Sequence, residues 1–277
     1  MDYIRAILLG LIQGVAEFLP ISSSGHLAIL HHLMPSTDAA VSDVTFDILL
    51  HLGTLVAVFI VFYKTIFHMV REFWRMCSGI LGGTFLWRKA NRYQIMSLYV
   101  IVTTMVLIPF ALVHNSFLGL SENLWSVGVA LLVTAAMLFV ADHSVRGTKE
   151  MKDMTLMQAI KMGLFQGIAT IPGVSRSGMT IAAGINMGFD RNTMVEFSFM
   201  MSIPAVLGAV VMDLGDMAAG FTPANIGPYI VGTVVAAAVG VASIKLVKYV
   251  AKKNKFGWFM WYCAAAGVFA IVLDIIR

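Results

Sequence analysis

Arg176 is the residue whose setting most clearly asks for a chemical role. It lies in an otherwise uncharged, apolar stretch, and a charge at the centre of a membrane costs about 2.5–3.5 kcal/mol. An anion should therefore meet it, either an internal carboxylate such as Glu17 or a bound phosphate, which a guanidinium can grip with two hydrogen bonds. Glycines would let the backbone approach an anion, and a following helix would point its first N–H groups at it. The predicted phosphate-binding set is Gly173, Ser175, Ser177, Gly178 and Thr180.

A second set of polar residues lies near the N-terminus. Gln13 and Glu17 are four residues apart and share one helix face just before Pro20 breaks the helix. If a helix restarts near residue 23, Ser23 and His26 stand on one face, and an imidazole there could take or deliver a proton at the hydroxyl. Serines in such a turn also satisfy backbone groups, so the spacing alone is a weak indication. The predicted substrate-binding residues of this set are Gln13, Ser22, Ser24 and Gly25.

Other ionisable side chains rank lower as site residues. Asp47 and His51 could face the site or only pack between helices. Glu196 could help to hold Arg176. His31 and His32 are expected at the membrane interface.

The composition places these residues in a membrane. Of the 277 residues, 59% are hydrophobic and 12% are charged, with a mean hydropathy of +0.85, whereas soluble domains carry about 25% charged residues. Six apolar runs are long enough to span a bilayer. The chain is therefore expected to be an all-α polytopic membrane protein, with spans at 46–63, 95–113, 124–141, 194–212, 226–248 and 257–276.

Two further apolar stretches, 2–34 and 155–188, are interrupted at their centres by proline, glycine and serine. Irregular backbone at membrane depth persists only where protein or a water-filled cavity satisfies its polar groups. Both stretches are therefore predicted to be re-entrant helix pairs, and they carry the two candidate sets at their tips.

An internal repeat relates the two stretches. A shift of 153 residues aligns Gly10–Ala16 with Gly163–Ala169, and Ser22, Ser24 and Gly25 with Ser175, Ser177 and Gly178. Each half holds one re-entrant pair and three spans, so the second half is expected to be inverted, with both tips near the bilayer midplane. We predict one integral membrane domain over 1–277, with repeat one at about 1–141 and repeat two at about 155–277.

The basic residues predict the orientation. Segments 64–92, 142–161 and 245–255 are rich in Lys and Arg, whereas 35–45, 114–123 and 213–225 contain none. The positive-inside rule makes the first group cytoplasmic and places both termini outside. The cluster of lysines at 252–255 is interpreted as a topology signal that contacts anionic lipid, not as a nucleic-acid site.

The motifs Gln13–Pro20, Ser22–His26, Pro172–Gly178 and Glu196–Phe199 resemble those of the undecaprenyl-diphosphate phosphatase family, also called bacitracin-resistance proteins. The resemblance covers essentially the whole chain. It implies hydrolysis of a C55 polyprenyl diphosphate to the monophosphate and inorganic phosphate, which recycles the lipid carrier for peptidoglycan and other envelope polymers. The family's acidic motif reads Glu or Gln, three residues, then Glu, and here its first position is Gln13.

The resemblance also implies a cofactor, a location and partners. Members typically need a divalent cation, usually Mg²⁺ or Ca²⁺, which Glu17 could hold together with the diphosphate oxygens. The expected location is the bacterial plasma membrane. From the predicted topology, the site is expected to open on the external face, because the half that carries Glu17, Ser23 and His26 enters from there. The expected partners are the polyprenyl diphosphate, membrane lipids and, as an open alternative, a second copy of the chain, with no nucleic acid.

Three mechanisms remain open from spacing alone. Ser23 could attack the terminal phosphorus with Glu17 and His26 positioning it and Arg176 stabilising the charge. His26 could attack instead, or Glu17 or His26 could activate water. The rival function is transport of undecaprenyl phosphate, because inverted repeats with broken helices are also a transporter architecture.

Overall fold

The computed structural model describes residues 1–33, 44–113, 117, 119–120, 123–253 and 256–276. Most of the predicted external segments 35–45 and 114–123, and part of the lysine cluster at 252–255, lie outside the described residues. The described chain is helical and contains no β-sheet; its one isolated bridge joins Lys149 and Phe189. Six of its helices are long and apolar enough to cross a membrane. They are α3 (Val44–Leu81), α4 (Arg92–Leu112), α5 (Leu124–His143), α8 (Arg191–Met212), α10 (Ile226–Lys253) and α11 (Gly257–Ile276).

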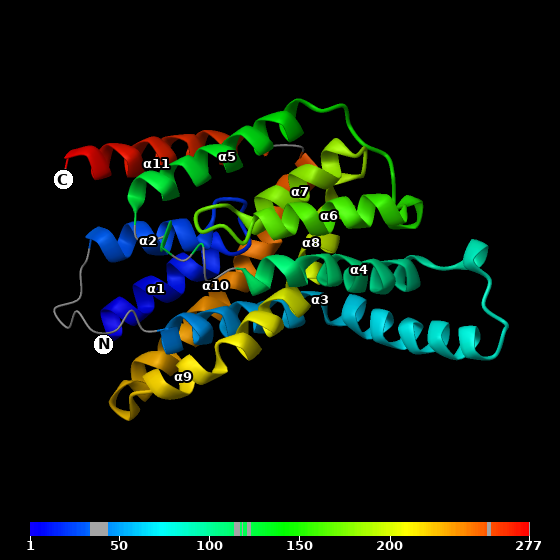
Figure 1. Ribbon diagram of the computed structural model, residues 1–277, viewed down its shortest axis with the longest axis horizontal. Helices are drawn as coiled ribbons and strands as arrows, with labels where there is room; N and C mark the ends of the chain where they lie inside the picture. The colour runs from blue at the N-terminus through cyan, green and yellow to red at the C-terminus, as the bar shows by residue number, and fades with distance from the viewer. Residues whose placement is uncertain (34–43, 114–116, 118, 121–122, 254–255, 277) are drawn as a thin grey trace.

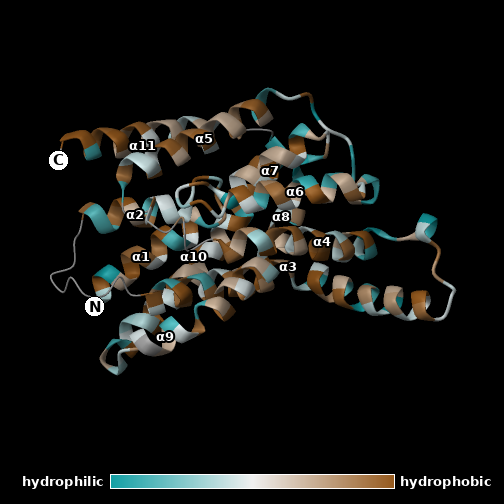
Figure 2. Cartoon of the chain, in the orientation of Figure 1, coloured by the Kyte–Doolittle hydropathy of each residue, from teal (hydrophilic) through white to brown (hydrophobic). Residues whose placement is uncertain are grey.

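All six predicted spans are confirmed, because one of these helices covers essentially the whole of each. The helices are mostly hydrophobic, with hydrophilic residues gathered at loops and helix ends (Figure 2). A helix is the economical solution in lipid because every interior backbone group finds its partner within the segment. The structure is thus that of a multi-pass membrane protein.

Helix α3 is much longer than predicted. Beyond the span at 46–63 it bends at Phe62, where the backbone leaves helical geometry (φ −111°, ψ 19°), and continues to Leu81. The prediction of a basic loop from residue 64 is therefore wrong for its first part. Glu72 stabilises this extension, since it accepts hydrogen bonds from Arg75 (2.7 Å) and from Asn91 (2.9 Å), the N-cap of α4.

The two interrupted stretches form pairs of short helices. The first pair is α1 (Tyr3–Ala16) and α2 (Ser23–Leu33), and the second is α6 (Leu156–Ile168) and α7 (Arg176–Asn186). At 1.5 Å per residue none exceeds about 21 Å, whereas the hydrocarbon core is about 30 Å thick. In Figure 1 the α1–α2 pair enters from the end of the molecule where α11 finishes, and the α6–α7 pair enters from the opposite end. The 153-residue repeat itself remains a prediction from the sequence.

Glycines bring the helices close together. A Cβ atom on Gly14 of α1 would lie 2.8 Å from the carbonyl oxygen of Ala236 in α10. Between α5 and α11, a Cβ on Gly128 would lie 2.6 Å from the Gly267 oxygen, and one on Gly267 would lie 2.8 Å from the Gly128 oxygen. Small residues at such crossings are the usual means by which helices pack in membranes. These crossings fix α10 against α1, which leads to the tip of the first pair, and α11 against α5.

Short elements complete the connections: the 3₁₀ turns at Trp87–Lys89, Met151–Asp153 and Pro223–Asn225, and α9 (Leu214–Gly220). The buried core runs through the middle of the bundle. In it Phe18, next to the first tip, meets Phe199 of α8 edge-on with centroids 5.5 Å apart, and Phe199 contacts Phe62 at the bend of α3.

Candidate active site

The tips of the two helix pairs meet inside the bundle. The backbone N–H of Gly173 donates to Ser24 Oγ (3.1 Å), and Ser177 Oγ donates to the carbonyl oxygen of Leu19 (3.2 Å). Gly173 has φ +90°, and a Cβ there would lie 2.8 Å from the Cβ of Ala130 in α5. Only glycine suits that position, since the left-handed region and the close neighbour both disfavour a side chain.

Glu17 and Arg176 form an ion pair across this junction, through Glu17 Oε1 and Arg176 Nη2. The other carboxylate oxygen, Oε2, accepts hydrogen bonds from Ser23 Oγ (2.7 Å) and Gln13 Nε2 (3.1 Å). His51 of α3 places its Nε2 3.8 Å from the same oxygen. The Glu17 carboxylate is therefore the centre of a cluster drawn from α1, α2, α3 and α7, and it brings together both sets of residues that the sequence singled out.

Two polar atoms of this cluster are buried and lack a hydrogen-bond partner within the described part of the chain: Arg176 Nη1 and Gln13 Oε1. A buried polar group without a partner costs about 1–3 kcal/mol, and more when the group is charged. Arg176 donates to Glu17 through Nη2, and its Nη1 remains a donor without an acceptor in the described part of the chain. The site thus has spare hydrogen-bonding capacity for an anion at Arg176.

The serines of both tips hold the turns in shape. Ser22 Oγ accepts from Gly25 N, and Ser175 Oγ, 153 residues further on, accepts from Gly178 N, both at 3.1 Å. Ser22 has φ +73°, an unusual conformation for a serine, and its backbone oxygen accepts from His26 N (3.3 Å). These bonds set the first turns of α2 and α7, so the two helix N-termini point into the junction, where they favour negative charge.

The structure corrects the predicted contact between Ser23 and His26. Helix α2 does begin at Ser23, as expected, but Ser23 donates to Glu17. His26 Nδ1 lies 2.7 Å from the Ser22 carbonyl oxygen, and Nε2 lies 2.7 Å from the hydroxyl of Tyr262. No hydrogen bond joins Ser23 to His26 in the described structure, because the imidazole Nδ1 binds the backbone carbonyl oxygen of Ser22, one turn earlier.

The other candidates lie at different distances from the cluster. Thr180 is fully buried, and its hydroxyl is hydrogen bonded with Arg176 O (2.8 Å) and Ser198 Oγ (2.7 Å), so it supports α7 behind the site. The suggestion that Glu196 holds Arg176 is wrong. Glu196 instead accepts from Arg92 (2.6 Å) and from Thr65 (2.8 Å) on α3, near the basic end of the bundle.

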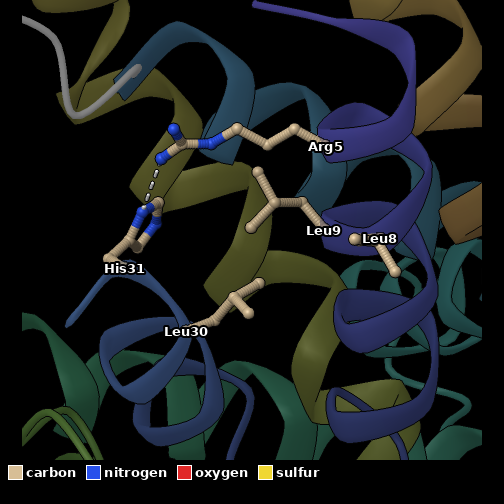
Figure 3. Close-up of a pocket in the computed structure, with 5 residues that line it drawn as sticks. All are labelled: Arg5, Leu8, Leu9, Leu30 and His31. Atoms are coloured by element: carbon tan, nitrogen blue, oxygen red, sulfur yellow. Dashed lines mark hydrogen bonds between the residues drawn. The ribbon is translucent and has the colours of Figure 1, made fainter. Parts of the chain in front are cut away.

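His31 lies at the far end of α2, away from the Glu17–Arg176 cluster. It faces Arg5 of α1 across a small hollow lined by Leu8, Leu9 and Leu30, with His31 Nδ1 3.4 Å from the guanidinium (Figure 3).

Three residues that touch the tips were not among the candidates. Tyr262 contacts His26, Cys263 Sγ donates to Pro20 O (3.4 Å), and Thr134 of α5 accepts from Ser175 N at 3.0 Å. They belong to spans that are distant in sequence from both motifs. The only signal that could have found them is the presence of a polar side chain inside an apolar helix.

The metal-binding potential of the site is limited. No cluster of three or more His, Cys, Asp or Glu side chains able to hold a metal occurs among the residues that the structure describes. The junction offers one carboxylate, Glu17, beside the Ser23 hydroxyl and the His51 imidazole. Magnesium commonly binds through one or two carboxylates together with substrate phosphates. The donor set thus fits an ion shared with a phosphorylated substrate, and not one held by protein groups alone.

Comparison with known proteins agrees with the geometry. The family model described as "Bacitracin resistance protein BacA" matches residues 6–269. The undecaprenyl-diphosphatase of Alkaliphilus metalliredigens is 37% identical over 281 residues, with 100% of both chains covered. That of Methanosphaera stadtmanae is 34% identical, covering 100% of this chain and 99% of the relative, and that of Desulfatibacillum aliphaticivorans is 33% identical with 100% of both covered.

Proposed function

The chain belongs to the bacitracin resistance protein BacA family, and we propose that it hydrolyses undecaprenyl diphosphate to undecaprenyl phosphate and inorganic phosphate at the Glu17–Arg176 junction. Relatives that match along their whole length carry the name undecaprenyl-diphosphatase. These names favour an enzyme over the transport alternative. The reaction regenerates the lipid carrier of cell-wall synthesis and fits the family's link to bacitracin resistance.

The main support for this function is the unused hydrogen-bonding capacity of Arg176. Arg176 combines an ion pair to Glu17 with a buried Nη1 that has no partner in the described structure. A diphosphate brings the oxygens that this nitrogen lacks, and the N-termini of α2 and α7 add backbone N–H groups and positive dipole ends. The charge that spreads over the phosphoryl oxygens during transfer would be stabilised by the same groups.

The geometry favours Ser23 as the nucleophile. Its hydroxyl already donates to Glu17 Oε2 at 2.7 Å, which is the arrangement in which a carboxylate accepts a proton as the oxygen attacks. Ser23 Oγ bonds to the terminal phosphorus, the bond from that phosphorus to the bridging oxygen breaks, and undecaprenyl phosphate leaves. Water then attacks the phosphoserine, which releases inorganic phosphate and returns the proton to Ser23.

The two other mechanisms receive less support from the contacts. Attack by His26 needs a free ring nitrogen, and both nitrogens of His26 are within hydrogen-bond distance of a partner. Direct attack by water activated at Glu17 would leave the Ser23–Glu17 hydrogen bond without a chemical role.

A divalent cation, Mg²⁺ or Ca²⁺, is part of the proposal. Glu17, with the Ser23 hydroxyl beside it, would hold such an ion together with the diphosphate oxygens. When bound, the ion would neutralise charge on the phosphate oxygens. Arg176 and the two helix N-termini perform the same task from the protein side.

The remaining partners and the location follow from the membrane fold. The prenyl chain would stay in lipid while the diphosphate reaches the junction. As the family resemblance implies, the protein would sit in the bacterial plasma membrane, and the distribution of basic residues would place the entry of α1 and α2 on the external face. The site would open there. A homodimer stays a prediction.

Phosphate release by the purified protein in detergent tests this function. Undecaprenyl diphosphate is supplied in excess with Mg²⁺ or Ca²⁺, and the expected result is many turnovers per protein molecule. Detergent micelles have no two sides, so transport alone would release nothing. Protein that is folded and yet releases no phosphate with either ion would contradict the proposal.

A further inference from the structure

Tyr262 contacts the first helix pair near its polar tip and is a residue that the sequence did not single out. Its hydroxyl is 2.7 Å from His26 Nε2, and the two rings are stacked with centroids 5.5 Å apart and an angle of 8° between their planes. Tyr262 belongs to α11, more than 230 positions from His26 in the chain. The contact thus depends on tertiary packing.

The hydrogen bonds fix the tautomer of His26. A carbonyl oxygen can only accept, so Nδ1, 2.7 Å from Ser22 O, carries a hydrogen. In the neutral ring Nε2 is then the acceptor, and the Tyr262 hydroxyl donates to it. Ser22 and Tyr262 thus bind the two ring nitrogens of the imidazole, which leaves the ring one orientation.

The position of Tyr262 is itself held firmly. The neighbouring Cys263 is fully buried, and its thiol donates to the Pro20 carbonyl in the tip loop. Behind it, α11 crosses α5 at Gly128 and Gly267 with no room for a Cβ atom on either residue. Tyr262 is nevertheless 47% exposed, so the contact with His26 lies at the surface of the molecule, where a lipid substrate can arrive.

We propose that Tyr262 is a positioning residue for the reaction: its hydroxyl donates to Nε2 and, together with the Ser22 carbonyl oxygen at Nδ1, fixes the orientation of the His26 ring between α2 and α11. This inference rests on the proposed function. Nε2 is the ring nitrogen whose partner is a half-exposed side chain for which substrate can compete, since Nδ1 is committed to the backbone of Ser22. Without the Tyr262 hydroxyl, the ring keeps only the Ser22 contact.

Tyr262→Phe is the direct test, because it removes the hydroxyl and keeps the stacked ring. The matched control is Tyr249→Phe on α10, a tyrosine that is 60% exposed and contacts Lys253. The first readout is the ¹⁵N spectrum of histidine-labelled protein, with the His26 signals identified by their loss in His26→Gln. Wild type and control should show the Nδ1–H tautomer with Nε2 as a hydrogen-bond acceptor, and Tyr262→Phe should keep that tautomer and shift the Nε2 signal, because this nitrogen loses its donor.

The second readout is phosphate release. Tyr262→Phe should lower kcat about tenfold, within the range seen when a residue that orients a functional histidine is removed, and change KM less than twofold. Unchanged His26 spectra, or a loss confined to KM, would overturn the inference. If the wild-type protein releases no phosphate, the proposed function fails, while the spectra still decide whether the Tyr262 hydroxyl binds Nε2 and orients His26.

Discussion

Glu17 and Arg176 form an ion pair that joins the tips of the two helix pairs, across 159 positions of sequence. Each side chain alone would be a charge buried inside a membrane protein. Together they fix the junction at which Ser23, Gln13 and His51 gather. The hydrogen bonding of Arg176 is nevertheless incomplete, because its Nη1 has no partner in the described structure.

Ser23→Ala should reduce phosphate release to less than about 1% of the wild-type rate, since removal of the nucleophile of a covalent mechanism typically costs several orders of magnitude. Acid quenching of the wild-type reaction should trap phosphate on Ser23, identified by peptide mass. The control is Ser78→Ala on the extension of α3, whose hydroxyl bonds only to backbone oxygens of Trp74 and Arg75. Full activity in Ser23→Ala would eliminate Ser23 as the nucleophile.

Glu17→Gln keeps the shape of the side chain but removes its charge and its ability to take the Ser23 proton. We expect kcat to fall about 10²–10⁴-fold, the usual contribution of a general base. The matched control is Glu150→Gln, because the side chain of Glu150 is 66% exposed and forms an ion pair with Lys152 at the surface. A Glu17→Gln protein with near wild-type kcat would show that Ser23 is activated by another group.

Chelation tests the divalent ion. The described residues include no group of three or more metal-ligating side chains, so the ion should depend on substrate oxygens and be removed easily by excess EDTA. Phosphate release should stop in EDTA and return when Mg²⁺ or Ca²⁺ is added above the chelator. Undiminished release in excess chelator would mean that Arg176 and the helix N-termini suffice to neutralise the substrate.

Gly14→Ala should destabilise the protein by about 1–3 kcal/mol, the usual cost of inserting an atom into a closely packed contact. The added Cβ would lie 2.8 Å from both Ala236 O and the Cβ of Val239 in α10. Gly208→Ala in α8 is the control, because nothing lies within 4 Å of its added Cβ. Thermal unfolding in detergent should show a lower Tm for Gly14→Ala alone; equal Tm values would mean that α1 and α10 can separate without cost.

Much of the architecture could be predicted from the sequence because a membrane leaves few options. Length and apolarity located the six spans, and proline, glycine and serine located the two tips. The spacing of Gln13 and Glu17 correctly placed them on one face, where they are hydrogen bonded. The Glu17–Arg176 pair was foreseen as one of two partners for the arginine, and the structure shows that it forms while a second donor stays open.

What could not be predicted depends on contacts between distant segments or on competition between nearby acceptors. Helix spacing suggested that His26 serves Ser23, but the backbone carbonyl of Ser22 is closer and takes Nδ1. Glu196 pairs with Arg92, and not with Arg176 as suggested, because the extension of α3 and the start of α4 lie at the same end of α8. Tyr262 contacts His26 because α11 packs closely against α5, and no local sequence pattern predicts that packing.

The measurement that tests the account most directly is phosphate release from undecaprenyl diphosphate by Arg176→Ala in detergent, beside wild type and Arg5→Ala. Arg5 is the matched control because it lies at the far end of α1, next to His31. We predict a loss of at least about 100-fold for Arg176→Ala, as expected for removing a donor that stabilises the transferring phosphoryl group, and little change for Arg5→Ala. An Arg176→Ala protein that is folded and releases phosphate at the wild-type rate would contradict the placement of the site.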